Sequence, residues 1–137
     1  MYSESKIDVR YAETDQMGIV HHSVYAIWYE AARTDFTKNF NMTYAQMEKE
    51  GIMTPLVELT SQYKKPAHYG DTVTVRTSIQ KLTPARIVFY YEVYRGEELL
   101  NTGTTMHALT GKDLKPINLK KVRPDIYEMM EKSMETK

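Results

Sequence analysis

The chain has 137 residues, of which 18 are basic and 18 acidic, and it has no cysteine. This length suits one domain with a real core, which buries roughly two-thirds of the surface of the unfolded chain. Balanced charge argues against a nucleic-acid partner, and the lack of cysteine excludes disulfides, thiolate zinc sites and cysteine nucleophiles. No apolar run has the length of a signal-peptide core or the ~20 residues of a membrane span. We therefore expect one domain over residues 1–137, soluble and cytoplasmic.

The first part of the chain changes from a strand pattern to a helix pattern. Ile7, Val9 and Tyr11 alternate with polar residues, which predicts a half-buried strand. From residue 25 the apolar side chains recur at the spacing of one helix face, and most of them are aromatic. They are Tyr25, Trp28, Tyr29, Ala32, Phe36 and Phe40. We therefore place this helix at the centre of the core rather than on its surface.

The remaining chain predicts a short helix, four strands and a closing helix. Thr43 and Gln46 fit a capping box, and Gly51 suits the left-handed position that ends a helix. Alternating runs over 57–63, 73–79, 87–93 and 99–109 predict strands, and their short connections with Gly or Pro predict an antiparallel meander. Pro124 is well placed to open the last helix. The predicted class is α+β, with a curved antiparallel sheet of about five strands wrapped around the long helix.

Residues 9–36, VRYAETDQMGIVHHSVYAIWYEAARTDF, resemble the opening motif of a known enzyme family. This family is the hotdog-fold acyl-CoA thioesterases of the 4-hydroxybenzoyl-CoA thioesterase type, including the Tol-Pal-associated enzymes. The matching positions are Glu13, Thr14, Asp15, Gly18, Ile19, Val20, His22, Glu30 and Arg33. The later KPAHYGD, residues 65–71, is similar to the turn before the family's third strand. One departure is His21, where many relatives carry an aromatic residue.

The stretch ETDQMGIVHH, residues 13–22, gathers the groups that thioester hydrolysis needs. Such a reaction requires a base or nucleophile, and hydrogen-bond donors where charge develops on the carbonyl oxygen. Asp15 can supply the carboxylate and Gly18 a sharp turn, while free N–H groups near His22 open the helix. The resemblance implies the same roles, with Asp15 as base or nucleophile and the His22 backbone N–H as oxyanion donor. It also implicates the His22 side chain.

Further predictions concern the substrate contacts and the partners. The predicted contacts along the loop and helix are Gly18, Ile19, Val20 and Tyr25. Candidates for the phosphates of coenzyme A are Lys64, Lys65 and Arg86. Coenzyme A is part of the substrate, so we expect no separate cofactor and no metal. The resemblance further implies subunits that pair edge to edge in a homodimer or homotetramer, and open sheet edges favour such pairing.

Two other side chains complete the predicted site. Glu30 follows the loop by about two helical turns, which makes it the reserve carboxylate. Its spacing to Arg33 also predicts an ion pair on the helix face. Adjacent His21 and His22 diverge in direction and no third ligand follows at helical spacing, which argues against a metal site.

Several alternatives stay open at this point. A loop Asp before Gly is often only a turn former or helix cap. A hotdog hydratase or dehydratase would act on the same thioesters, although the His-x-Pro-Gly loop of that type is absent. A non-catalytic acyl-thioester-binding protein is the third alternative. Tyr90 and Tyr94, which alternate out of phase with Phe89 and Tyr91, fit either an amphipathic sheet or a subunit interface.

Overall fold

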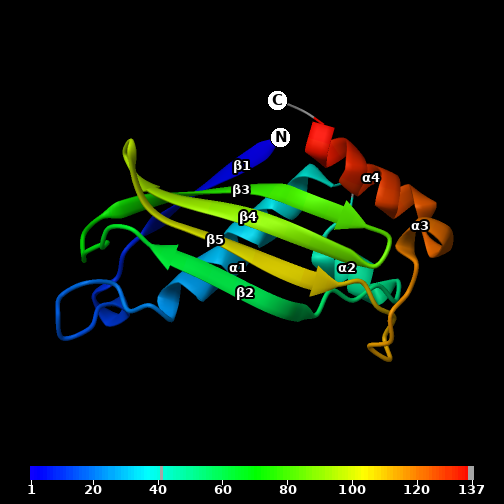
Figure 1. The fold of residues 1–137 in the computed structure, drawn as a ribbon, viewed down its shortest axis with the longest axis horizontal. Helices are drawn as coiled ribbons and strands as arrows, with labels where there is room; N and C mark the ends of the chain where they lie inside the picture. Colours follow the sequence, from blue (N-terminus) through cyan, green and yellow to red (C-terminus); the bar gives the residue numbers. More distant parts are fainter. Residues whose placement is uncertain (41, 136–137) are drawn as a thin grey trace.

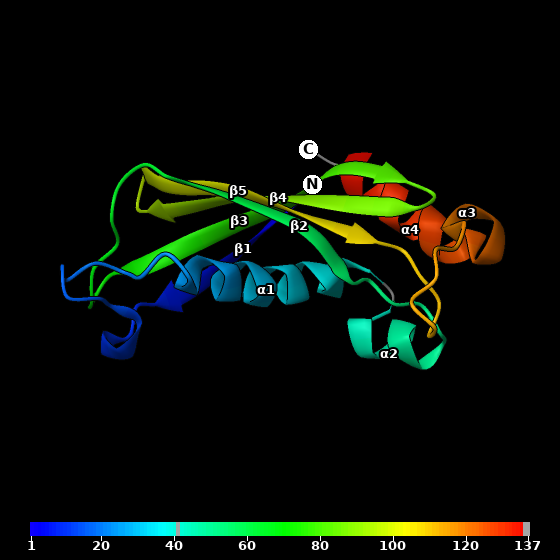
Figure 2. The same ribbon diagram turned by 60° about the horizontal axis from the view of Figure 1, so that its bottom comes forward.

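The structure, a computed structural model, describes residues 1–40 and 42–135. Its elements are β1 (Tyr2–Asp8), η1 (Tyr11–Glu13), α1 (Val24–Phe36), η2 (Thr37–Asn39), α2 (Tyr44–Lys49), β2 (Leu56–Tyr63), β3 (Thr72–Thr83), β4 (Arg86–Arg95), β5 (Glu98–Ala108), α3 (Leu119–Val122) and α4 (Pro124–Glu135). Five antiparallel strands form one curved sheet, and α1 lies along one of its faces (Figures 1 and 2). The predicted fold class is confirmed. Within the described ranges, no helix is long and apolar enough to cross a membrane.

Helix α1 packs on the sheet through the predicted aromatic stripe. The buried members of the stripe are Tyr25, Trp28, Tyr29, Ala32, Phe36 and Phe40. The Tyr29 ring stacks on Tyr91 of β4, with the ring centroids 4.4 Å apart. Its hydroxyl reaches β5 above Gly103, where an added Cβ would lie 2.3 Å from the Tyr29 oxygen. A side chain at this position of β5 would therefore push the helix away from the sheet.

The strand order corrects the predicted meander. Strands β3, β4 and β5 do follow one another, but the full order is β1-β3-β4-β5-β2, so that β2 pairs with β5. The physical reason is that β1 occupies the free edge of β3 along Thr72–Ser78, which leaves no place there for β2. As an edge strand, β2 is exposed along its length apart from Ser61, so its alternating pattern does not reflect a half-buried face.

Local signals place most boundaries correctly. The capping box is confirmed, because Thr43 Oγ1 accepts the Gln46 N–H at 3.2 Å and Gln46 Oε1 accepts the Thr43 N–H at 2.8 Å. Gly51 has φ +91°, and α4 begins at Pro124. The first strand is shifted toward the N-terminus, since Tyr11 lies in η1 with its side chain exposed. Helix α3 was not predicted.

A chain of buried polar groups crosses the core beneath the sheet. Arg33 donates to Tyr91 Oη at 3.0 Å, and Tyr91 Oη and Thr105 Oγ1 are 2.5 Å apart. His107 Nε2 lies 3.0 Å from Thr105 Oγ1, and its Nδ1 lies 3.0 Å from the Thr54 carbonyl oxygen. A carbonyl only accepts, so Nδ1 carries the proton and Nε2 accepts from Thr105. The network therefore requires a neutral His107.

We predict that His107 makes folding sensitive to mild acid. Burial, with a smaller effect of the Arg33 charge, lowers the pKa of His107 from 6.5 to about 4. As the pH falls from 6.5 toward 4, His107 takes up a proton in the unfolded chain but stays neutral in the folded chain. The folded state therefore loses stability across this pH window. The full loss is on the order of 3 kcal/mol for the shift to about 4.

Urea unfolding at pH 7 and at pH 4.5 measures this loss in the native protein and in His107→Gln. The variant has no titrating group at this position, so its stability should change less between the two pH values. An equal loss in both proteins would contradict the assignment.

Candidate active site

The loop between β1 and α1 folds back on itself around Asp15. The Asp15 N–H donates to the Ile19 carbonyl, and the Gly18 N–H donates to the Asp15 carbonyl, both at 2.9 Å. The Met17 N–H donates to Asp15 Oδ1 at 2.8 Å. Gly18 has φ +81°, in the left-handed region that glycine adopts without strain. The turn uses Oδ1, whereas Asp15 Oδ2 accepts no hydrogen bond from the described part of the chain.

Glu13 fastens this loop to α1. Its carboxylate is buried, with Oε2 accepting the Trp28 indole N–H at 3.2 Å and Oε1 accepting the Arg10 backbone N–H at 2.8 Å. The Arg10 guanidinium lies 3.4 Å from Oε2. The Glu13 carbonyl accepts the His21 N–H at 2.9 Å, so Glu13 joins the start of the loop to its end. The family resemblance included Glu13 among the matching positions but predicted no role for it.

The backbone N–H groups at the start of α1 differ in their partners. The Ser23 N–H donates to His21 Nδ1 at 3.2 Å, and the Val24 N–H donates to the His21 carbonyl at 3.0 Å. The His22 N–H makes no hydrogen bond within the described ranges. It lies at the N-terminal end of the helix, where the helix dipole favours a negative charge.

Asp15 and His22 lie on the wall of the same cleft, which has a volume of about 290 Å³. The cleft brings together most of the predicted residues. Its lining consists of Asp15, Met17, Ile19, Val20, His22, Tyr25, Tyr63, Lys64, Lys65 and Pro66. Gly18 shapes the turn beside the cleft without lining it. Met17, Tyr63 and Pro66 were not predicted.

Tyr63 forms an aromatic wall at the end of β2. Its hydroxyl donates to the His22 carbonyl at 3.1 Å, and its ring meets the Tyr25 ring edge-on with centroids 5.2 Å apart. Burial raises the pKa of Tyr25, so the Tyr25 hydroxyl stays protonated. The sequence did contain a signal for Tyr63, because it ends an alternating run directly before Lys64. The role of Tyr63 in the cleft could not be predicted without the position of β2 in the sheet.

Glu30 and Arg33 do not form the predicted ion pair. Glu30 is exposed on α1 and does not line the cleft, whereas Arg33 points its guanidinium at Tyr91 Oη. No ion pair joins the two side chains in the described structure. The prediction was wrong because a buried hydroxyl on β4 competes successfully for the guanidinium.

Arg86 lies at the far end of the sheet from the cleft. It begins β4 and faces Ala108, near the end of β5. Tyr63 of the cleft faces Asn101, seven positions earlier on the same strand. At about 3.3 Å per residue the two places are on the order of 20 Å apart. Arg86 therefore does not reach the cleft of its own subunit.

The basic groups around the cleft differ in how far they are neutralised. Lys65 Nζ lies 3.0 Å from Glu98, and Arg95 contacts Glu98 at 2.6 Å and Asp71 at 2.7 Å. Lys64 makes no ion pair with any residue in the described ranges. Of these cations, Lys64 is the one whose charge is free for a ligand.

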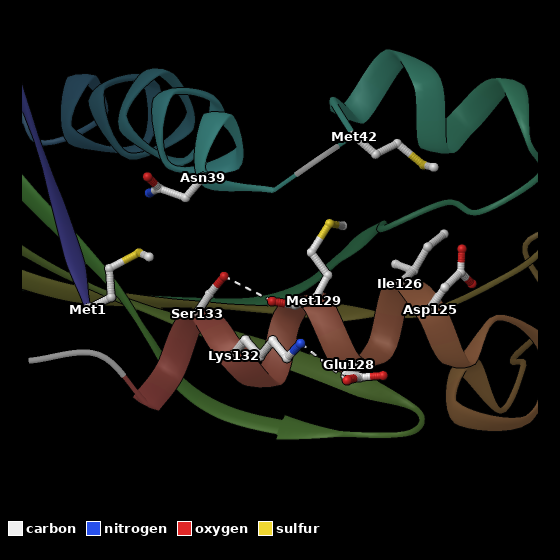
Figure 3. A pocket seen from close by; sticks show the side chains of 9 residues that line it. All are labelled: Met1, Asn39, Met42, Asp125, Ile126, Glu128, Met129, Lys132 and Ser133. Carbon is white, nitrogen blue, oxygen red and sulfur yellow. Dashed lines mark hydrogen bonds and ion pairs between the residues drawn. The ribbon is translucent and has the colours of Figure 1, made fainter.

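A larger groove of about 530 Å³ lies between α4 and the segment that follows α1 (Figure 3). Four of its nine lining side chains are apolar, and most of the polar ones, Asp125 among them through Arg123, are paired with near neighbours in sequence. Lys132 binds Glu128 at 3.3 Å, and Ser133 donates to the Met129 carbonyl at 3.1 Å. The smaller cleft is therefore the better candidate for chemistry. Within residues 1–40 and 42–135, no three His, Asp or Glu side chains are grouped so as to hold a metal ion.

Known proteins are similar to this chain over nearly its whole length. A sequence profile of the Thioesterase superfamily matches residues 17–102. "Putative acyl-CoA thioesterase YneP" of Bacillus subtilis is 41% identical over 96% of each chain. The crystal structure of DHNA-CoA thioesterase from Staphylococcus aureus is 41% identical with a TM-score of 0.89, over 96% of this chain and 89% of that one. The hypothetical protein TT1821 from Thermus thermophilus is 40% identical with the same TM-score, over 99% and 100%.

We predict that Glu13→Ala destabilises the protein and releases the loop from α1. The change leaves the Trp28 indole N–H and the Arg10 N–H without their acceptor, at an expected cost of about 1–3 kcal/mol. Trp28 is the single tryptophan, so its fluorescence reports this site directly. A shifted emission maximum and a lower urea midpoint are expected. Native values for both would contradict the anchoring role.

Proposed function

The chain belongs to the thioesterase superfamily, and we propose that it hydrolyses the thioester of an acyl- or aroyl-CoA to the free acid and coenzyme A. The observation that carries the proposal is that one cleft is lined by both Asp15 and His22, whose N–H has no acceptor among the described residues. The names of relatives support the same reaction, since they include acyl-CoA and DHNA-CoA thioesterases.

Asp15 is the proposed base or nucleophile. Its Oδ1 is engaged by the Met17 N–H, which fixes the carboxylate, while Oδ2 is left for the reaction. As a base, Oδ2 takes a proton from water as the hydroxyl adds to the thioester carbon. As a nucleophile, it adds to that carbon itself, and water then hydrolyses the resulting anhydride. Either way the C–S bond breaks and coenzyme A leaves as the thiol once protonated.

The His22 backbone N–H is the proposed oxyanion donor. When the thioester carbon becomes tetrahedral, its oxygen carries a negative charge, and a fixed donor stabilises that charge more than it stabilises the substrate. The N-terminal end of α1 adds its dipole to the same position. The His22 imidazole, which the family resemblance also implicates, is separated from the backbone role by His22→Ala, because alanine keeps the N–H.

The cleft divides into an acyl side and a coenzyme A side. Ile19, Val20 and Tyr25 supply apolar surface, which suits the acyl or aroyl group, and Gly18 keeps the turn open. Lys64 is the better proposed phosphate ligand, because Lys65 is already paired with Glu98.

Release of free thiol from a panel of acyl-CoAs tests the function. The panel should include short, medium and long saturated chains, benzoyl-CoA and DHNA-CoA, for which the S. aureus relative is named. Turnover that survives a chelator would support hydrolysis without a metal. Binding without thiol release would favour a non-catalytic acyl-thioester-binding protein, and hydration of an enoyl-CoA without thiol release would favour a hydratase.

We predict that Asp15→Asn lowers the rate of thiol release by about 10² to 10⁴. Asparagine keeps the size and the oxygen that accepts the Met17 N–H, so the turn and the stability should persist. Glu30→Gln is the matched control, since it removes an exposed carboxylate from the neighbouring helix and should be mild. The assignment fails if folded Asp15→Asn is nearly as active as the native enzyme while Glu30→Gln is inactive.

The exposed edge of β2 supports a homodimer. This strand leaves Val57 and Tyr63 each 53% exposed and Leu59 38% exposed, beside unpaired backbone groups. A second copy that pairs antiparallel with β2 covers this edge by a two-fold axis. The reversal would bring the Arg86 end of the second sheet toward the cleft of the first. This arrangement is a proposed route by which Arg86 reaches coenzyme A.

We predict that Leu59→Lys disrupts the dimer, because the charge replaces apolar surface at the centre of the β2 edge. Leu114→Lys is the matched control, since Leu114 is even more exposed but lies away from β2. Analytical ultracentrifugation should show a dimer or tetramer for the native protein and the control, and a smaller species for Leu59→Lys. Thiol release should fall together with assembly. A native monomer with full activity at the same concentration would contradict the proposal.

A further inference from the structure

The imidazole of His21 occupies an unusual place at the start of α1. Its Nδ1 accepts the Ser23 N–H at 3.2 Å and lies 2.8 Å from Ser23 Oγ. Its ring also packs on the His22 ring, with the centroids 4.1 Å apart and the planes at 32°. The two contacts tie the side chain of His21 to Ser23 and to the ring of His22, the residue that carries the free N–H.

His21 replaces the missing side-chain cap of the helix. Ser23 directly precedes α1, but it has helical φ and ψ and its hydroxyl caps no backbone N–H. The Val24 N–H instead donates to the His21 carbonyl at 3.0 Å, while the imidazole takes the Ser23 N–H. Side chains that accept an N–H two or three residues onward are the usual means of capping a helix. One residue thus satisfies both N–H groups that follow His22.

We propose that His21 is a positioning residue, which binds the two N–H groups that follow His22 and thereby fixes the direction of the free His22 N–H. The proposal rests on the proposed oxyanion role of His22. With the Nδ1 acceptor removed, the Ser23 N–H becomes an unpaired donor next to that of His22, and the turn before the helix loses this hydrogen bond. The oxygen of the substrate would then meet donors that must reorganise during the reaction, which weakens electrostatic stabilisation of the transition state.

The acceptor and the ring of His21 can be separated by two substitutions. His21→Asn keeps a short side-chain acceptor, of the kind that caps helices well, but removes the ring. His21→Phe keeps an aromatic ring against His22 but has no acceptor. If the acceptor positions the N–H, the asparagine variant behaves like the native enzyme and the phenylalanine variant does not.

Amide hydrogen exchange at Ser23, followed by NMR, tests the contact without any assay of activity. The Ser23 N–H should exchange slowly in the native protein and in His21→Asn, and about tenfold faster in His21→Phe. In thiol release, His21→Phe should lose about tenfold in kcat with KM nearly unchanged, because the donor acts on the transition state. His21→Asn should recover most of this loss. Circular dichroism and Trp28 fluorescence verify that each variant is folded.

Each outcome bears on the proposal separately from the proposed function. Native exchange and native kcat in folded His21→Phe would overturn it. A loss of kcat in His21→Asn as large as in His21→Phe, with the Ser23 amide still protected, would also overturn it, because the ring and not the acceptor would then matter. If the native protein releases no thiol from any acyl-CoA, the proposed function fails, and with it the catalytic part of this proposal. The exchange at Ser23 would still decide whether His21 caps the helix.

Discussion

The close approach of α1 to β5 at Gly103 is the constraint on which the rest of the structure depends. The absent side chain at Gly103 makes room for Tyr29, whose hydroxyl binds Ser61 on β2 and Asn101 on β5. Burial raises the pKa of Tyr29 to about 12, so the hydroxyl remains a donor at any working pH. One side chain therefore holds the helix to two strands, and this fixes both its distance and its rotation. Because the cleft is built at the N-terminal end of the same helix, the position of His22 follows from this contact.

The turn-forming and the catalytic interpretations of Asp15 are compatible. One carboxylate oxygen of this cleft residue accepts the Met17 N–H and closes the turn, while the other accepts no hydrogen bond from the residues that the structure describes. A carboxylate used in this way is oriented before substrate arrives, and it need not reorganise during the reaction. Glu13 extends the same logic inward, because it ties the base of the loop to Trp28. The loop is thus held by its own residues at the turn and by α1 at its base.

Local patterns predicted much of the fold, and distant pairing decided the rest. The aromatic stripe of α1, the Thr43 cap and the start at Pro124 depend on neighbours within a few residues, and all three are confirmed. The place of β2 depends on which strand takes the free edge of β3, and no periodicity within β2 encodes that choice. The partner of Arg33 was not predicted because it also depends on distant pairing, since Tyr91 is 58 residues away.

The site shows the same division between local and distant information. Asp15 and His22 lie seven residues apart in one motif, so the sequence alone could predict that they belong to one site. Tyr63 reaches the cleft only because β2 ends beside the loop. The sequence analysis predicted its neighbours Lys64 and Lys65 as site residues, but not Tyr63. The ion pair of Lys65 could not be predicted either, because its partner Glu98 lies far away in the sequence, at the start of β5.

The electrostatics of the cleft bear on the proposed binding of coenzyme A by a single subunit. The ligand carries several phosphate charges, yet Glu98 and Asp71 already neutralise Lys65 and Arg95. Among the cleft residues, Lys64 is the cation that has no ion pair within residues 1–40 and 42–135. One exposed lysine contributes little to affinity in water. Further positive charge has to come from elsewhere, and the open edge of β2 beside the cleft is where a second subunit can bring it. In the proposed dimer, pairing along the β2 edge would therefore make assembly and substrate binding depend on one another.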